Sequence, residues 1–229
     1  MSIVPNIHGS AQARLKLYQL ISTKLTKVQQ EFLEANPSLW ERIILELENS
    51  LNSNSLEKFD EMILSQAFLC IEKTSIDGLQ RQMKFLTGKE VWIGKHPTQL
   101  LNLFIDEHRQ IIKSIQTEQL NRISLSVKRG IRDGRMSKDT AKEIRETTGI
   151  NKARARLIAR NSVLNYCGAL TKHNQMSAGI KSYIWQSSGD ERVRDAHRKL
   201  DGKIFNWEGP GPHPKTEVNC RCDAIPVLD

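Results

Sequence analysis

The densest group of chemically capable side chains lies in two stretches, WQSSGDERVRDAHRKLDGKIF at residues 185–205 and NCRC at residues 219–222. Apolar and polar residues alternate just before and within the first stretch, which predicts strands over 181–186 and 203–207. A short helix is predicted between them, over 190–200, and an edge strand over 224–227, where a proline is tolerated. These patterns predict a small β-containing subdomain at residues 180–229.

The rest of the chain predicts helices, because apolar residues recur there at steps of three and four. The predicted helices cover 11–35, 39–51, 56–77, 98–131, 137–148 and 151–170. Residues 78–97 are rich in polar and glycine positions, and Pro97 marks a predicted boundary between residues 1–95 and residues 96–229. The predicted fold class is α+β and helix-dominated, with an N-terminal helical region followed by basic helices at 120–177 and the β-containing subdomain.

The excess positive charge is confined to one segment. The chain carries a net charge of +8, and residues 122–160, with twelve Lys/Arg and four acids, account for all of it. Such a concentration indicates a polyanion partner, although a solvated helix face or a contact with an acidic protein would explain it too. Phosphate contact independent of base sequence requires only a basic face. The predicted DNA-contacting residues are Arg129, Arg132, Arg135, Lys152, Arg154, Arg156 and Arg160.

A turn at Thr148-Gly149 between two predicted helices suggests a second possibility. Helix, glycine-containing turn and basic helix is the pattern of a helix-turn-helix, whose second helix can enter a major groove. The alternative function is therefore a stand-alone DNA-binding protein.

Three interpretations fit the C-terminal cluster. His197, His213, Cys220 and Cys222 are suitable ligands for zinc, although C-x-C is less usual than C-x2-4-C in structural zinc sites. Without metal, Asp190, Arg194 and His197 would form a hydrogen-bonded network, and the cysteines would be buried as small apolar groups. In the third interpretation, His197 is the general base of a metal-dependent nuclease. The paired carboxylates of a two-metal site are, however, missing from the cluster. The expectation is a protein that is not an enzyme, with zinc as its one possible cofactor.

Composition excludes other classes. The longest uncharged apolar run, residues 62–71, is too short to span a bilayer, and the N-terminus lacks the pattern of a secretory signal. Four cysteines are too few for a disulfide scaffold, and Cys70 and Cys167 are predicted to be buried thiols.

The order W-x4-D-x-R-V-R-x2-H-x2-L-D-G-K-x-F, followed by C-R-C, closely resembles the phage Mu F-like family of minor head proteins. Residues 158–161, IARN, and Asn165 are similar to the family's I-A-R-T-E and following asparagine, with Asn161-Ser162 in place of Thr-Glu. The resemblance covers about residues 120–223. Its motif residues are Arg160, Asn165, Trp185, Asp190, Arg192, Arg194, His197, Gly202, Cys220 and Cys222.

This resemblance implies a minor structural protein of a tailed-phage head or a prophage-derived particle. The implied roles are head assembly and DNA packaging or delivery, with the portal protein, other head proteins and double-stranded DNA as partners, and no membrane. The implied location is the virion, in the head interior or portal region, after synthesis in the host cytoplasm. Residues 96–229 would be the Mu F-like domain. The apolar stripes of the predicted helices make residues 1–95 a candidate for docking on the portal or forming oligomers, although ordinary burial within the fold would explain the same stripes.

Overall fold

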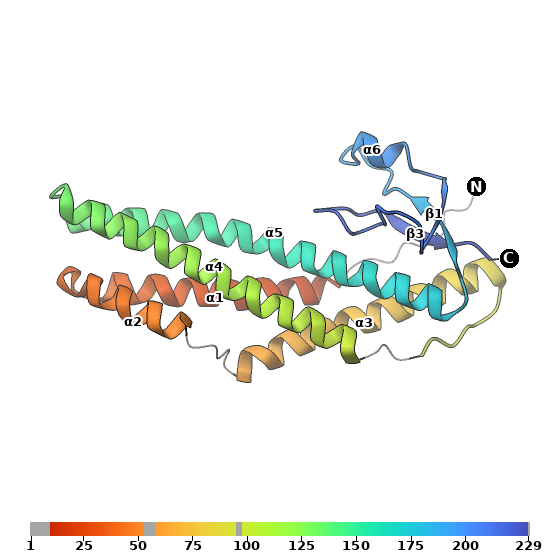
Figure 1. The fold of residues 1–229 in the computed structure, drawn as a ribbon, viewed down its shortest axis with the longest axis horizontal. Helices are drawn as coiled ribbons and strands as arrows, with labels where there is room; N and C mark the ends of the chain where they lie inside the picture. The colour runs from red at the N-terminus through yellow and green to blue at the C-terminus, as the bar shows by residue number, and fades with distance from the viewer. Residues whose placement is uncertain (1–9, 53–57, 95–97, 229) are drawn as a thin grey trace. The chain divides into compact units, whose positions relative to one another are not determined.

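The computed structural model describes residues 10–52, 58–94 and 98–228, and these are mostly helical. Its helices are α1 (Ala11–Glu34), a 3-10 turn (Pro37–Leu39), α2 (Trp40–Asn52), α3 (Lys58–Thr87), α4 (Thr98–Arg132), α5 (Ser137–Ser177) and α6 (Asp195–Arg198). Its strands are β1 (Ser182–Gln186), β2 (Ile204–Asn206) and β3 (Asp223–Pro226) (Figure 1). The predicted helix-dominated α+β class is confirmed. Within these ranges, no helix combines the length and apolarity that crossing a membrane requires.

Two predicted helix ends are wrong. Helix α3 continues to Thr87, well past the predicted end at residue 77, and Gly78 is buried inside it. Helix α5 passes through Gly149 without a break, so the predicted turn of a helix-turn-helix is absent. A glycine in a helix costs about 1 kcal/mol relative to alanine. Buried residues on both sides of Gly149, including Ile144 and Ala155, keep the helix packed and offset that cost.

The chain forms two compact units. Unit 1 comprises residues 1–14, 65–102 and 160–229, and unit 2 comprises residues 15–64 and 103–159. Each unit takes segments from both sides of residue 95, so the predicted boundary at 95/96 does not coincide with the boundary between units. Pro97 lies outside the described residues. Whether residues 1–95 and 96–229 have separate functions stays a prediction.

Unit 2 is a helical body in which parts of α1, α2, α4 and α5 run alongside one another (Figure 1). Its core contains Phe32 and Trp40, and the Trp40 indole N–H donates to the Phe32 carbonyl at 2.8 Å. The Gln119 amide is also buried, and it donates to the Leu25 carbonyl at 2.8 Å. Each fully buried large apolar side chain stabilises such a core by about 1.5–3 kcal/mol. The other members of the core are Val28, Ile44, Leu120, Ile123, Val127 and Ile144.

Unit 1 contains the sheet, whose order is β2-β1-β3 with antiparallel pairing throughout. The side chains of Tyr183 and Trp185 on β1 point inward and are fully buried, as their alternation predicts. The three predicted strands are confirmed, and β3 lies at an edge of this sheet. Gln175 at the end of α5 donates to the Ala224 carbonyl at 2.8 Å and accepts from the Trp207 indole N–H at 2.9 Å. These two hydrogen bonds fix the sheet on α5.

The loop before β3 also lies close to α5. A Cβ atom on Gly168 of α5 would be 3.0 Å from the Lys215 side chain and 3.1 Å from the Pro214 carbonyl oxygen, so only glycine permits this approach without a shift. In the same unit, Tyr166 packs edge-on against Phe68 of α3 and donates to Glu72 at 2.7 Å. The loop leading to Cys220 therefore packs directly against helix α5.

Candidate metal centre and basic surface

Three side chains of the predicted C-terminal cluster meet inside unit 1. His197 Nδ1 lies 3.7 Å from Cys220 Sγ and 3.5 Å from Cys222 Sγ. The ligand atoms of all three lie within 4.8 Å of one another, and all three residues are buried. The four cysteines of the chain are free thiols; Cys167 is buried as predicted, but Cys70 is only half-buried.

Local structure brings the three ligands together. The imidazole of His197 on α6 packs edge-on against Trp185 of β1, with ring centroids 5.2 Å apart. Cys220 ends a tight turn in which its N–H donates to the Glu217 carbonyl at 3.0 Å and Asn219 has a left-handed φ of 59°. The Asn219 N–H donates to the Asn161 side chain on α5 at 2.7 Å. Asn161, the residue that departs from the family's Thr, thus holds the turn before Cys220.

The second ring nitrogen of His197 faces a carboxylate. Nε2 and Glu217 Oε2 are 3.1 Å apart, and the Arg194 guanidinium donates to the same oxygen at 2.8 Å. The predicted network of Asp190, Arg194 and His197 is therefore wrong in its acid, because Glu217 takes the position assigned to Asp190. Glu217 is not part of the family motif, and its place three residues before Cys220 was the one available signal.

Asp190 has a different partner. It accepts two hydrogen bonds from Arg221, at 2.5 and 2.7 Å, and one from the Arg192 N–H at 3.0 Å. The Arg221 hydrogen bonds lower the pKa of Asp190 to about 2. Two-pronged Arg–carboxylate pairs fix orientation well, so this pair ties the turn at 187–192 to the residue between the two cysteines.

A hydrogen bond between the thiols of Cys220 and Cys222 couples their ionisation. The pKa of Cys220 is lowered because the Cys222 thiol donates a hydrogen bond to it and the Lys215 N–H donates another, at 3.3 Å. The pKa of Cys222 is raised by donating that hydrogen bond and by burial. The first ionisation therefore belongs to the pair, and it produces a thiolate, the form in which cysteine binds metals.

Lys215 carries a second buried interaction beside this cluster. Its ammonium forms an ion pair with Asp223, the residue after Cys222, and both side chains are 3% exposed. Burial lowers the pKa of Lys215. The loop that places Cys220 is therefore fixed at its backbone and at this side chain.

His213 is placed apart from the other predicted ligands. Its Nδ1 lies 2.8 Å from the Tyr183 hydroxyl, and its ring is 5.1 Å from that of Trp207. Both ring nitrogens of His197, in contrast, face protein atoms. A general base needs a nitrogen directed at its substrate, so this geometry favours a ligand or structural role for His197.

Residues 121–225 match the family model described as Phage Mu protein F like protein. This segment, slightly less than half of the chain, is therefore similar to the Mu F-like family. The match spans the end of α4, all of α5, the sheet and the His197–Cys220–Cys222 cluster. The sequence resemblance over about 120–223 is thereby confirmed.

Two curated relatives share part of this chain. An uncharacterised protein of Haemophilus influenzae (strain ATCC 51907 / DSM 11121 / KW20 / Rd) is 37% identical over 135 residues, covering 58% of this chain and 30% of its own length. The "Minor head protein GP7" of Bacillus phage SPP1 is 28% identical over 137 residues, covering 52% of this chain and 44% of its own length. The alignments span less than half the length of either relative. No solved structure gives a significant match.

The Mu F-like segment also carries all seven predicted DNA-contacting residues, and several of these pair within unit 2. Arg135 pairs with Glu143, Arg154 pairs with Glu118, and Arg132 pairs with Asp133. The Arg156 guanidinium lies 5.2 Å from the centre of the Tyr18 ring. The twelve basic residues of this segment therefore overstate the charge available to a partner.

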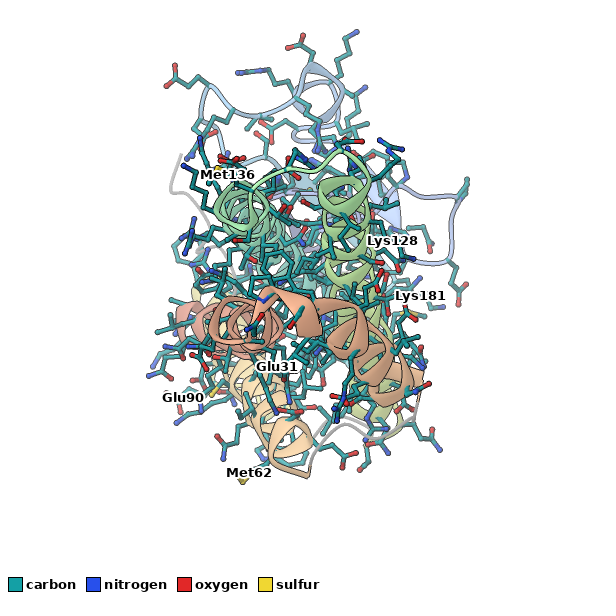
Figure 2. The ribbon with its side chains drawn as sticks, turned by 90° about the vertical axis from the view of Figure 1, so that its left-hand side faces the viewer. Glu31, Met62, Glu90, Lys128, Met136 and Lys181 are labelled. Atoms are coloured by element: carbon teal, nitrogen blue, oxygen red, sulfur yellow. The ribbon has the colours of Figure 1, made fainter. Side chains whose placement is uncertain are left out.

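The remaining predicted residues are Arg129, Lys152 and Arg160, and none of them has an ion-pair partner among the described residues. Arg129 is exposed near the end of α4, with its Nε donating to the Leu125 carbonyl at 3.2 Å. Lys128 beside it is also exposed and projects from the edge of unit 2, as does Met136 in the connection to α5 (Figure 2). Lys152 is half-buried and Arg160 is exposed, both on α5.

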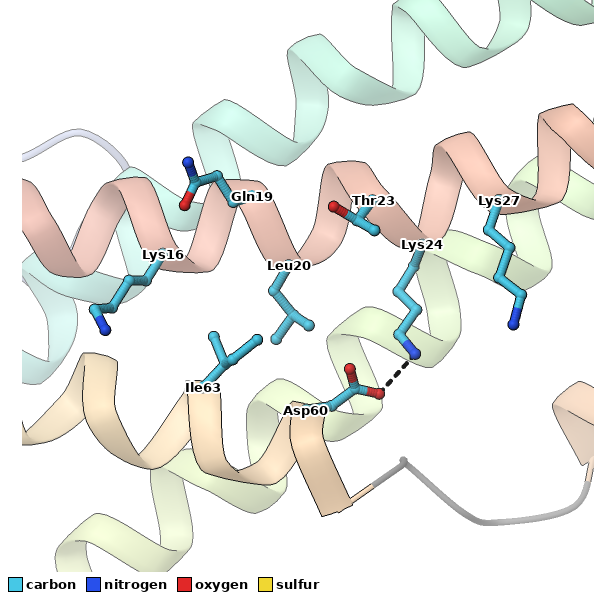
Figure 3. A pocket seen from close by; sticks show the side chains of 8 residues that line it. All are labelled: Lys16, Gln19, Leu20, Thr23, Lys24, Lys27, Asp60 and Ile63. Carbon is cyan, nitrogen blue, oxygen red and sulfur yellow. Dashed lines mark ion pairs between the residues drawn. The ribbon is translucent and has the colours of Figure 1, made fainter.

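A pocket lies in unit 2, outside the Mu F-like segment. Its volume is about 380 Å³, and it lies between α1 and the start of α3 (Figure 3). Lys16, Lys24 and Lys27 line it, and Lys24 reaches across to the buried Asp60 at 2.7 Å. This pocket offers positive charge and apolar surface, with its acid already paired.

Proposed function

We propose that this protein is a minor structural component of the head of a tailed phage or of a prophage-derived particle. The observation that carries the proposal is the Mu F-like match over residues 121–225, together with a relative named as a minor head protein. The protein would act in head assembly and in DNA packaging or delivery, without catalysing a reaction. It would reside in the virion after synthesis in the host cytoplasm.

Particle composition tests this role. Purified particles from cells that produce the phage should contain the protein, in fewer copies than the major capsid protein, when measured by quantitative mass spectrometry. Deleting its coding sequence should lower the yield of DNA-filled, infectious particles, and supplying the protein in trans should restore it. Absence from purified particles, together with an unchanged infectious yield in the deletion, would refute the proposal.

Contact with DNA phosphates is the part of the proposal supported by charge. Three predicted residues, Arg129, Lys152 and Arg160, form no ion pair with an acid within the described part of the chain, and phosphate contacts need no particular base sequence. The continuous helix α5 removes the structural basis of the helix-turn-helix alternative, because no turn separates residues 137–148 from the basic helix.

Salt-dependent binding distinguishes phosphate contact from other roles of these charges. The affinity for random duplex DNA should fall linearly with salt on logarithmic axes, and Arg129→Gln or Lys152→Gln should each reduce that slope by about 1. Arg42→Gln is the matched control, because Arg42 is an exposed arginine on α2, outside the basic segment. If neither substitution changes the slope of DNA affinity against salt, contact of these residues with DNA is excluded. The proposed role in the phage head would not be affected by that result.

Contact with the portal or with another head protein is proposed for exposed apolar side chains within residues 1–95. Trp92 is 84% exposed, and the nearby Phe85 and Leu86 are exposed as well. Single exposed apolar residues are normal, but a tryptophan this exposed is suited to burial against a partner. Deleting residues 1–95 would remove most of α1 and all of α2 from unit 2, and most of α3 from unit 1, so point substitutions are the better test.

The test is incorporation into heads. Trp92→Ala should reduce the amount of protein in purified heads, whereas Met136→Ala, a substitution at another exposed apolar residue outside 1–95, should not. Equal incorporation of both variants would exclude Trp92 as part of the docking surface.

A further inference from the structure

We infer that His197, Cys220 and Cys222 bind a thiophilic divalent cation, Zn²⁺ in the cell, and that its fourth coordination position opens to a small pocket. This site does not depend on the proposed head role. Imidazole and thiolate are the ligands that zinc prefers, and three protein ligands with one open position are a known arrangement. Binding releases thiol protons to solvent, and the metal then forms bonds to both sulfurs and to the imidazole nitrogen.

The donor separations fit a tetrahedral ion. With Zn–S bonds of about 2.3 Å and a Zn–N bond of about 2.1 Å, tetrahedral geometry places sulfur and nitrogen about 3.6 Å apart. The observed separations from His197 Nδ1 are 3.5 Å to Cys222 Sγ and 3.7 Å to Cys220 Sγ. A hydrogen bond explains only one of these contacts, because a single lone pair on Nδ1 accepts one proton. One metal ion satisfies both.

The groups around the ligands are arranged as in a metal site. Ligating histidines usually donate their other N–H to a carboxylate, which fixes the tautomer and the ring orientation. Glu217 supplies that carboxylate at 3.1 Å from His197 Nε2, and Arg194 holds it in place. Glu217 and Arg194 are therefore positioning residues, and the carboxylate–histidine pair leaves Nδ1 deprotonated and directed at the sulfurs.

Hydrogen-bond donors also face the two sulfurs. The backbone N–H of Lys215 donates to Cys220 Sγ at 3.3 Å. The indole N–H of Trp185, which packs in the same buried cluster as Cys222, has no hydrogen-bond partner within range among the described residues. A buried N–H without an acceptor costs free energy, and a metal-bound thiolate at Cys222 would be a stronger acceptor than a thiol.

The fourth position faces a pocket of about 70 Å³ that the three ligands themselves line. Arg192, Arg194 and Arg221 contribute to the same pocket, and each of the three is paired with an acid. The pocket has room for a water molecule or a small anion. The ion would link α6, the turn at 217–220 and the start of β3, which a sheet of such short strands does not hold by itself.

Cobalt titration of the metal-free full-length protein tests the site directly. One equivalent of Co²⁺ should produce the thiolate charge-transfer and intense d–d bands of a tetrahedral site, and one equivalent of Zn²⁺ should abolish them. Adding azide should shift the d–d bands if the fourth position is open. No charge-transfer band on titration would overturn the metal site, and a spectrum that azide leaves unchanged would overturn the open position.

Variants assign the ligands. Cys220→Ser and Cys222→Ser should each weaken the charge-transfer band, and Cys70→Ser, at a thiol on α3 outside the cluster, should leave it unchanged.

Because the first two substitutions fall in the interior and can impair folding, Glu217→Gln provides an independent measurement at a half-exposed residue. It should lower the Zn²⁺ affinity about 10- to 100-fold while keeping the spectrum, whereas Glu191→Gln, at an exposed acid of the same region, should not. Full affinity in Glu217→Gln would refute the positioning role, and an unchanged band in both cysteine variants would refute the site.

Discussion

Replacing Asp223 by asparagine would leave the Lys215 ammonium without its charged partner in the interior of unit 1. Both side chains are 3% exposed, so solvent screening does not reduce their interaction as it does for a surface pair. At an effective dielectric constant of about 20, two unit charges 4 Å apart attract by about 4 kcal/mol. Removing one member of a buried pair typically costs about 3–5 kcal/mol. We expect Asp223→Asn to lower the free energy of unfolding by this amount.

A double-mutant cycle separates the pair's interaction from the cost of each substitution. Lys215→Met should be as damaging as Asp223→Asn, because it removes the cation that forms an ion pair with the buried carboxylate. The combination of Lys215→Met with Asp223→Asn should cost much less than the sum of the single changes, since neither residue then remains as an uncompensated buried charge.

Urea denaturation followed by tryptophan fluorescence measures these differences, with Trp185 and Trp207 reporting on unit 1. Arg42→Met is the control for an exposed ion pair, because Arg42 and Glu46 are 76% and 60% exposed, and it should cost less than about 1 kcal/mol. Single variants at Lys215 and Asp223 that cost no more than this control, or a double variant that equals their sum, would refute the reasoning.

Three further predictions concern single residues. Gly202 has a φ of +76°, and a Cβ added there would meet nothing within 4 Å, so Gly202→Ala should cost only the left-handed strain of about 1–2 kcal/mol, measured by thermal unfolding. Gly168→Ala should also destabilise the protein. Overpacking against the Pro214 carbonyl costs about 1–3 kcal/mol, which exceeds the gain in helix propensity of about 1 kcal/mol. A more stable variant would contradict this prediction. Burial lowers the pKa of His108 below 6.5, so the unfolded chain binds its proton first and stability falls as pH drops below 6.5. His108→Gln should lose less stability than the parent between pH 7.5 and 5.5 in urea denaturation, and equal losses would exclude His108 as the cause.

Regular patterns made much of the fold predictable from the sequence. The alternation of apolar and polar residues around Tyr183 and Trp185 predicts a strand with one buried face, and the structure confirms that strand. Glycine was misleading at Gly78 and Gly149, because its local cost of about 1 kcal/mol is smaller than the packing free energy of the long helices that contain it.

The composition of the site was only partly predictable. His197, Cys220 and Cys222 stand out by residue type, and the structure brings them together. Glu217 and Lys215 do not, because their positions depend on a chain reversal with left-handed residues at 215 and 219. The pairing of Asp190 with Arg221, 31 residues apart, likewise depends on which side of the sheet each loop reaches.

The division of each unit among distant segments has a consequence for synthesis on the ribosome. Unit 2 lacks its second segment until residue 159 has been made, and unit 1 lacks its third until the chain has reached residues 160–229. Until then the apolar faces of α1 and α3 lack part of their native contacts, a state in which nascent chains aggregate or recruit chaperones. The residues inferred to bind zinc emerge after all of unit 2, so metal capture would follow the synthesis of that unit. A ribosome that stalls before Cys220 would release a chain with the whole basic segment already made and its C-terminal sheet unfinished.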